Sequence, residues 1–256
     1  MPPNSDGTVR FALAAGVNAR VSPGAPGPLP VFYLIDSVSL SVPPSHRDFA
    51  LRRDTEGSSW ETGDELRFET PGGGLVSALF YVPELNGDCS LWYPVATMPA
   101  RRRGVLALEA LAPLCVARTS VRVFDPDGAA LLCVNDGVSP HEIDGALEVA
   151  PDFSILTARD AYCGWRLQKP LARLSPRREL VAPRIPTPSA AANNEARYLY
   201  RLFELVNDHT LDAISDRDDD LAQQLESLRE EVIALGESPA ARAIRARIED
   251  LLEWSV

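Results

Sequence analysis

The chain has little lysine, histidine and cysteine, and each shortage narrows the chemistry available to it. Lys169 is the only lysine among 25 basic residues, so a P-loop lysine or a Schiff-base lysine has a single candidate. The three histidines and four cysteines include no Cys-x-x-Cys pair and no histidine at zinc-ligand spacing from a cysteine. The sequence therefore predicts neither a metal site nor a cofactor.

Long apolar runs are absent as well. Residues 1–8 are polar and lack the apolar core of a signal peptide. No run approaches the roughly 20 apolar residues of a membrane helix. We therefore expect a cytoplasmic protein with no membrane partner and with reduced cysteines.

Negative charge is abundant and unevenly distributed. The formal net charge is −11. The residues from Glu195 onward hold 15 acidic and 7 basic side chains, a net charge of −8, whereas the first 194 residues have a net charge of −3. A surface of this sign repels a phosphate backbone, so a nucleic-acid partner is not expected.

The first 183 residues have the pattern of short strands separated by turns. Val31–Val42 changes from a solid apolar run to strict alternation, which predicts one strand buried on both faces in its first half. Asn86-Gly87 predicts a hairpin that joins Leu75–Val82 to a strand at Cys89–Thr97.

Further turn signals follow along the same region. Asp125–Gly128 predicts a hairpin between two apolar strands, because its residues favour a tight turn. Asp144-Gly145 predicts another hairpin, and Phe153–Thr157 and Tyr162–Leu167 are the last strands expected. Arg101-Arg102-Arg103 is expected to be an exposed turn.

The remainder of the chain is predicted to be helical. Residues 184–194 are rich in proline and small polar residues and are expected to be a linker, followed by an acidic helical region at 195–256. Leu221–Leu235 and Ala240–Trp254 are expected to form a helical hairpin. The predicted fold class is therefore α+β, with about nine to eleven short, mostly antiparallel strands before a helical hairpin or bundle.

The first helix of this hairpin carries an apolar stripe at helical spacing. Its interaction residues are Leu221, Leu225, Leu228, Val232 and Leu235. Two uses of the stripe remain open: packing within the chain, or pairing of two copies into a homodimer through the C-terminal helices.

A basic segment precedes the linker. Arg159–Arg184 holds six arginines and one lysine against two acidic residues, and arginine beside exposed aromatic rings is typical of binding hot spots. The candidate peptide-binding residues are Tyr162, Trp165, Arg166, Arg173 and Arg177. The alternative is that the arginines of this segment face the acidic helices or water.

One catalytic alternative is a cysteine nucleophile with a histidine base. His141 follows the loop at Asp136–Pro140, and Cys163 would be its nucleophile if the two strands meet. Such pairs are adjacent in space and not in sequence, so the spacing does not test them.

The strand pattern of Val31–Val42, the Asp125–Gly128 hairpin and the helical end together resemble the peptide-binding accessory proteins of ribosomal-peptide natural-product pathways, such as the crocagin pathway. The resemblance implies capture of a precursor peptide and its presentation to a modifying enzyme.

From its residues, the chain is predicted to be a non-catalytic polypeptide-binding protein, in which exposed strand edges accept an extended peptide by β-augmentation. The alternatives are an immunity or antitoxin protein, whose acidic surface would mask a basic toxin, and the Cys/His enzyme.

Overall fold

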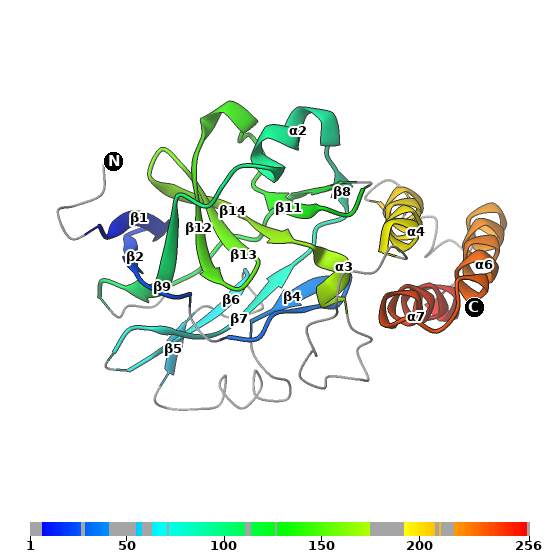
Figure 1. The fold of residues 1–256 in the computed structure, drawn as a ribbon, viewed down its shortest axis with the longest axis horizontal. Coiled ribbons are helices and arrows are strands. Elements are labelled where there is room, and N and C mark those ends of the chain that lie inside the picture. Colours follow the sequence, from blue (N-terminus) through cyan, green and yellow to red (C-terminus); the bar gives the residue numbers. More distant parts are fainter. Residues whose placement is uncertain are drawn as a thin grey trace.

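The chain folds as an α+β protein in which strands come first and helices follow (Figure 1). The structure is a computed structural model that describes residues 7–26, 29–40, 55–57, 63–70, 72–110, 114–125, 127–174, 192–207, 210 and 218–254. The predicted fold class is confirmed. The described strands number fourteen, more than the sequence predicts, because four of them (β3, β4, β5 and β8) have only two or three residues.

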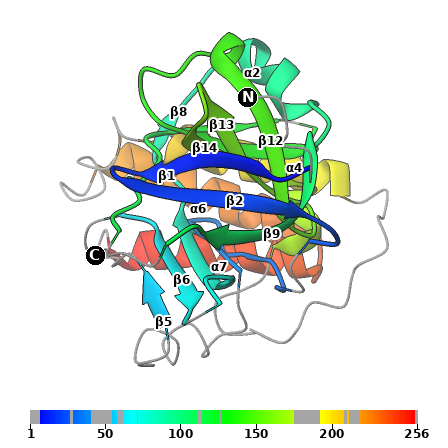
Figure 2. The same ribbon diagram turned by 90° about the vertical axis from the view of Figure 1, so that its left-hand side faces the viewer.

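Nine of the described strands form one sheet. In spatial order it contains β1 (Val9–Ala14), β2 (Val17–Pro23), β9 (Arg102–Leu108), β12 (Ile143–Ala150), β13 (Phe153–Ala158), β14 (Ala161–Gln168), β11 (Ala130–Val134), β10 (Val121–Phe124) and β8 (Leu85–Asn86). The Ala12 amide of β1 donates to the carbonyl of Asp160 beside β14 at 2.9 Å, and β1 and β14 run parallel there. The strands from β1 to β14 in this order therefore close into a ring, with the β1–β2 hairpin lying between β14 and β9 (Figure 2).

A smaller, fully antiparallel sheet packs against the first. Its order is β3 (Phe32–Tyr33), β4 (Ser37–Ser39), β7 (Leu75–Tyr81), β6 (Glu65–Glu69) and β5 (Thr55–Gly57). The single strand predicted for Val31–Val42 is wrong, because the chain turns between β3 and β4, where the Leu34 amide donates to the Ser37 carbonyl at 2.9 Å. Ile35 lies at this turn with φ 71°, which is rare for a β-branched residue, and its side chain is buried. Residues 41–42 of the predicted strand lie outside the described residues.

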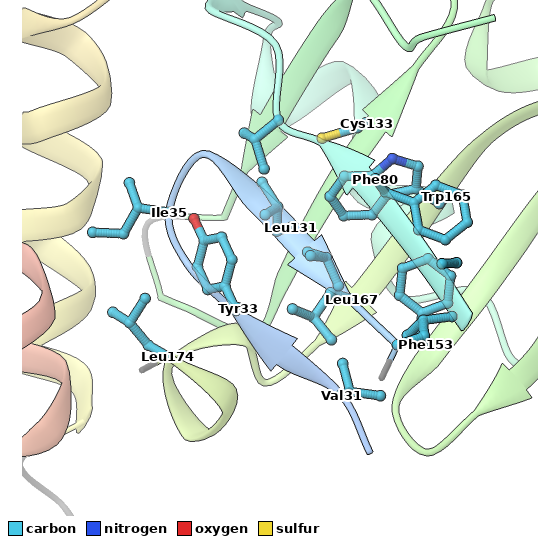
Figure 3. Packing of buried hydrophobic residues seen from close by; sticks show 14 of the residues in the cluster. Val31, Tyr33, Ile35, Phe80, Leu131, Cys133, Phe153, Trp165, Leu167 and Leu174 are labelled. Carbon is cyan, nitrogen blue, oxygen red and sulfur yellow. The ribbon is translucent and has the colours of Figure 1, made fainter. Parts of the chain in front are cut away.

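One apolar core joins the two sheets. Phe80 of the smaller sheet lies 4.9 Å from Phe153 and 6.1 Å from Trp165 of the larger sheet, measured between ring centroids (Figure 3). All three side chains are fully buried. Rings at these separations gain electrostatic stabilisation beyond the area that they bury.

The segment predicted as a strand at Cys89–Thr97 is instead helix α2 (Cys89–Ala96). The Asp88 carboxylate accepts a hydrogen bond from the Ser90 amide at 2.8 Å, which caps the first turn. Trp92 is buried on the side of the helix that packs on the larger sheet. The capping residue and the helical spacing of the buried side chains outweigh the β-propensity of the segment.

Of the three hairpins predicted from the sequence, two are wrong. Asn86-Gly87 ends β8, which pairs in parallel with β10, and leads into α2. Asp144-Gly145 lies within β12, and the chain turns later, near Asp152, whose φ is 64°. The hairpin at Asp125–Gly128 is confirmed between β10 and β11, where Gly128 has φ 72°.

The helical end consists of α4 (Ala192–Leu205), α6 (Asp219–Ala234) and α7 (Pro239–Trp254) among the described residues. The predicted pair of helices is confirmed as α6 and α7, which lie together beside α4 (Figure 1). Helix α4 begins inside the predicted linker, of which residues 184–191 lie outside the described residues. None of the described helices combines the length and apolar content needed to cross a bilayer.

Arg122 of β10 holds helix α4 against the larger sheet. Its side chain is 4% exposed, and its Nη2 donates to the carbonyl oxygens of Phe203, at 2.8 Å, and Val206. Its Nε donates to Asn86 Oδ1 at 2.7 Å. Burial lowers the pKa of Arg122 to about 10, so the guanidinium remains charged at neutral pH. A buried cation here complements the partial negative charge at the C-terminal end of the helix.

Replacing Arg122 by methionine should destabilise the protein. Arg122→Met keeps an apolar side chain of similar length but leaves the carbonyls of Phe203 and Val206 buried without this donor. We expect the free energy of unfolding to fall by about 2–4 kcal/mol in urea titrations followed by circular dichroism. The control is Arg10→Met, at an exposed arginine, which should change the value by less than about 1 kcal/mol. Equal losses in the two variants would contradict a capping role for Arg122.

Candidate functional site

The two aromatic residues predicted to bind peptide are buried in the core. Trp165 has no exposed surface, and its ring stacks on Phe153 with centroids 5.7 Å apart (Figure 3). Tyr162 is 8% exposed, and its hydroxyl donates to Asp64 Oδ2 at 3.3 Å. Neither ring is available to a peptide, so this part of the predicted site is wrong.

Arg166 is also buried, with 1% of its surface exposed. Its Nη1 donates to the carbonyl oxygens of Val95 at 2.8 Å, Ala96 at 3.2 Å and Met98 at 2.6 Å. These carbonyls are at the C-terminal end of α2, so Arg166 caps that helix and does not form an exposed binding surface as predicted.

The remaining two candidates for peptide binding are Arg173 and Arg177. Arg173, at the end of the short helix α3 (Pro170–Arg173), donates from Nη2 to Asp152 Oδ2 at 2.7 Å. Arg177 lies outside the described residues. The four described residues of the predicted peptide-binding set therefore do not form one exposed surface.

The apolar stripe on α6 is used for packing within the chain. Leu221, Leu225, Leu228 and Val232 are buried, and Leu235 is partly buried. Arg201 of α4 makes a bidentate contact with Glu231 of α6, with N···O distances of 2.6 and 3.0 Å. Pairing of two copies through this stripe would require these helices to separate.

An open cleft of about 490 Å³ lies where β2 and β14 end and β9 begins. It is lined by Pro23, Gly24, Pro99, Ala100, Arg101, Arg102, Arg103, Glu148 and Gln168. We refer to it as the arginine cleft. The described residues of its lining include three cationic side chains and one anionic side chain, in a chain whose net charge is −11.

Backbone pairing fixes the arginines at this cleft. The Arg101 amide donates to the Ala146 carbonyl at 2.8 Å, just before β9 starts to pair with β12 in parallel. A Cβ atom at Gly104 would lie 1.7 Å from the carbonyl oxygen of Ser22, so β2 and β9 approach this closely only because residue 104 is glycine. The approach brings the end of β2 to the wall of the cleft.

The arginines differ in their surroundings. Arg103 Nε lies 2.7 Å from Glu148 Oε2, and the side chain of Arg103 is 69% exposed whereas that of Glu148 is 15% exposed. The Nε atom of Arg102 is buried and has no hydrogen-bond partner in the structure. The side chain of Arg101 lies close to β12. A Cβ atom added to Gly145 of that strand would lie 3.3 Å from Arg101 Cδ.

A row of polar side chains leads from the cleft into the protein. Glu148 pairs with Arg103 on one side and with Ser154 on the other, and Ser154 pairs with Arg166. Directly paired residues point to the same face of a sheet, so these four side chains are neighbours. Burial lowers the pKa of Arg166 and Glu148 opposes that shift, while the buried Nε of Arg166 has no hydrogen-bond partner.

This arrangement is suited to binding anions. Guanidinium groups present planar sets of donors that match carboxylate and phosphate oxygens, and they stay charged at every physiological pH. A volume of about 490 Å³ is large enough for several side chains of a ligand. The described residues include no group of histidine, cysteine and acidic side chains able to hold a metal ion.

The two residues of the predicted Cys/His pair have different surroundings. Cys163 is 3% exposed, and burial, together with the nearby carboxylates of Asp144 and Glu142, raises the pKa of its thiol to about 12. His141, in the 3-10 helix η1 (Pro140–Glu142), is exposed, and its Nε2 lies 3.3 Å from Ser139 Oγ. A thiol that remains protonated at neutral pH is a poor nucleophile.

The sequence pattern did not predict the arginine cleft. Arg101-Arg102-Arg103 is not an exposed turn as predicted, because Arg102 and Arg103 are the first residues of β9. The signal available was three arginines leading directly into the alternating segment Gly104–Leu108. The position of Glu148 opposite Arg103 depends on a parallel pairing of distant strands, which no local pattern indicates.

Comparisons with protein-family models, with curated proteins and with solved structures found no match to this chain. The geometry and charge of the arginine cleft are therefore the basis for a functional proposal.

A buried carboxylate links the two sheets at Tyr162. Asp64 has no exposed surface, and its Oδ1 accepts from the Tyr81 amide at 3.0 Å while its Oδ2 accepts from Tyr162. Burial raises the pKa of Asp64 to about 7, although both hydrogen bonds and the guanidinium of Arg118 oppose the shift. Folded protein thus holds a proton at Asp64 that unfolded protein releases near pH 4.

Stability should therefore decrease as pH rises through the pKa of Asp64. Between pH of about 5 and 8 the ionisation of Asp64 should lower the free energy of unfolding by on the order of 2–3 kcal/mol. Asp64→Asn keeps an acceptor for the Tyr81 amide and should remove this decrease, as measured by urea unfolding at both pH values. Glu109→Gln, at a partly exposed carboxylate, is the control and should follow the wild type. Parallel pH profiles for wild type and Asp64→Asn would show that Asp64 does not carry the dependence.

Proposed function

We propose that this protein is a non-catalytic polypeptide-binding protein that holds an acidic segment of its partner in the arginine cleft. The observation that carries the proposal is the concentration of Arg101, Arg102 and Arg103 in one open cleft of a strongly acidic chain. The positive charge of these arginines attracts anionic groups to the cleft, whereas the negative charge of the rest of the surface repels a long polyanion.

Side-chain capture replaces the β-augmentation expected from the sequence. The β1–β14 pairing closes the ring at Ala12 and Ala161, so β1 is not an open edge there, and β14 lies between β13 and β11. At the other end of the larger sheet, β8 has only two residues, and Asn86 donates from Nδ2 to the Phe203 carbonyl of α4 at 2.8 Å. An extended peptide at the larger sheet would thus bind mainly through its carboxylates, and its backbone would contribute less.

The partner we propose is a precursor peptide that the protein presents to a modifying enzyme in the cytoplasm. This role is the one implied by the resemblance to the accessory proteins of ribosomal-peptide pathways. The cleft adds a chemical criterion, because the bound segment would be rich in glutamate or aspartate.

An immunity or antitoxin protein remains the second candidate, and one observation favours it. The exposed face of α6 carries Asp219, Asp220 and Glu230, which would attract a basic toxin. Deleting the helices would not separate the two functions cleanly, because residues of α4 such as Leu199 and Leu202 belong to the same core as the sheets. The charge of the ligand separates them better.

The direct test is binding of a fluorescein-labelled peptide of alternating glycine and glutamate, followed by fluorescence anisotropy at about 0.1 M salt. The double variant Arg101→Gln/Arg103→Gln should weaken binding by roughly 10- to 100-fold, because two charge-assisted contacts are lost. The matched control is Arg10→Gln/Arg159→Gln, which removes two exposed arginines that are paired with glutamates elsewhere. Its affinity should equal that of the wild type.

Three outcomes would contradict the proposal. One is no binding of the glutamate peptide by the wild type, and another is equal loss of affinity in both double variants. The third is tighter binding of the matching lysine peptide or of a single-stranded oligonucleotide. Tight binding of the lysine peptide would favour the inhibitor function instead.

A further inference from the structure

Glu148 occupies an unusual position for a surface ion-pair partner. Its backbone is fixed in the ring, between β9 and β13, and its carboxylate is mostly buried while Arg103 is mostly exposed. The enclosed carboxylate is therefore the more restricted member of the pair, and the exposed guanidinium is the one that a ligand can reach. In most surface pairs both side chains move in solvent and the interaction contributes little.

The carboxylate of Glu148 also interacts with more than one arginine. It contacts Arg103 Nε directly, and its charge acts on the buried guanidinium of Arg166. Among the described residues that line the arginine cleft, it is the only acidic one. Glu148 thus occupies the place that an anionic ligand would take beside Arg103.

We propose that Glu148 is an internal competitor that a carboxylate of the bound peptide must displace from Arg103. This inference rests on the proposed function, since it concerns the same cleft and the same acidic ligand. A carboxylate that approaches Arg103 meets a guanidinium whose Nε already contacts Glu148. The protein selects by this means for segments with several carboxylates, because a single carboxylate gains too little from the exchange.

A purely structural role for the pair makes the opposite prediction. If Glu148 only held Arg103 in a conformation suited to binding, removing its charge would leave affinity unchanged or weaken it. If Glu148 competes, removing its charge strengthens binding, and the gain requires Arg103. Glutamine at this position keeps an oxygen that accepts from Arg103 Nε, so the geometry of the pair is preserved.

The experiment compares Glu148→Gln with the wild type, using the peptide of alternating glycine and glutamate. Affinity should rise roughly tenfold, because the guanidinium of Arg103 no longer has to give up a charged partner before it binds a carboxylate of the peptide. The matched control is Glu109→Gln, at the opposite end of β9, where Glu109 pairs with Arg10 at 2.5 Å. This control removes the same charge from the chain and should leave affinity unchanged.

A double variant gives the second readout. In the Arg103→Gln background, Glu148→Gln should produce little further gain, because the cation for which the two carboxylates compete is gone. A full tenfold gain in that background would overturn the inference. Circular dichroism of each variant checks that the fold is retained.

The possible failures are distinguishable. If the wild type binds the peptide through Arg101 and Arg103 but Glu148→Gln binds equally or more weakly, the competitor role is wrong and the proposed function stands. If neither the wild type nor Glu148→Gln binds, both are wrong. Binding by Glu148→Gln alone would mean that Glu148 blocks the cleft of the wild type, which would contradict the proposed function and the competitor role together.

Discussion

The arrangement of helices on this protein depends on two buried arginines that cap helix C-termini. Arg122 donates to the last carbonyls of α4, and Arg166 donates to those at the end of α2. The strands that carry them, β10 and β14, both flank β11. Each guanidinium replaces water for several carbonyl groups at once and places a positive charge at the negative end of a helix. The helices are thereby attached through the sheet strands.

Local signals in the sequence predicted those elements whose geometry is set by neighbouring residues. The hairpin at Asp125–Gly128 and the pair of helices α6 and α7 are of this kind, and both are confirmed. The turn at Ile35 could not be predicted, because a β-branched residue rarely has positive φ and tertiary packing holds it there. Helix α2 was mistaken for a strand because its aromatic residues have β-propensity, although Asp88 supplied a capping signal.

The candidate site was less predictable than the fold. The composition of the segment 159–184 predicts exposed arginines. Arg166 is instead buried, where it caps α2, and its neighbour Trp165 fills the core between the sheets. Whether an arginine points inward depends on which helix packs over its strand, and a composition count does not contain that information. The arginine cleft likewise requires β9 to pair with β12, which places Glu148 opposite Arg103.

The buried helix caps and the arginine cleft both use arginine in a chain that has almost no lysine. A buried lysine tends to lose its proton, because burial lowers the pKa of the ammonium group towards neutrality. Burial also lowers the pKa of Arg122, but only to about 10, so the charge survives. Nη1 of Arg166 alone contacts three carbonyls. A guanidinium has five donors in one plane, which would let each arginine of the cleft contact a carboxylate through two atoms. The same side chain thus serves as a structural cap where it is enclosed and as an anion-binding group where the cleft leaves it open.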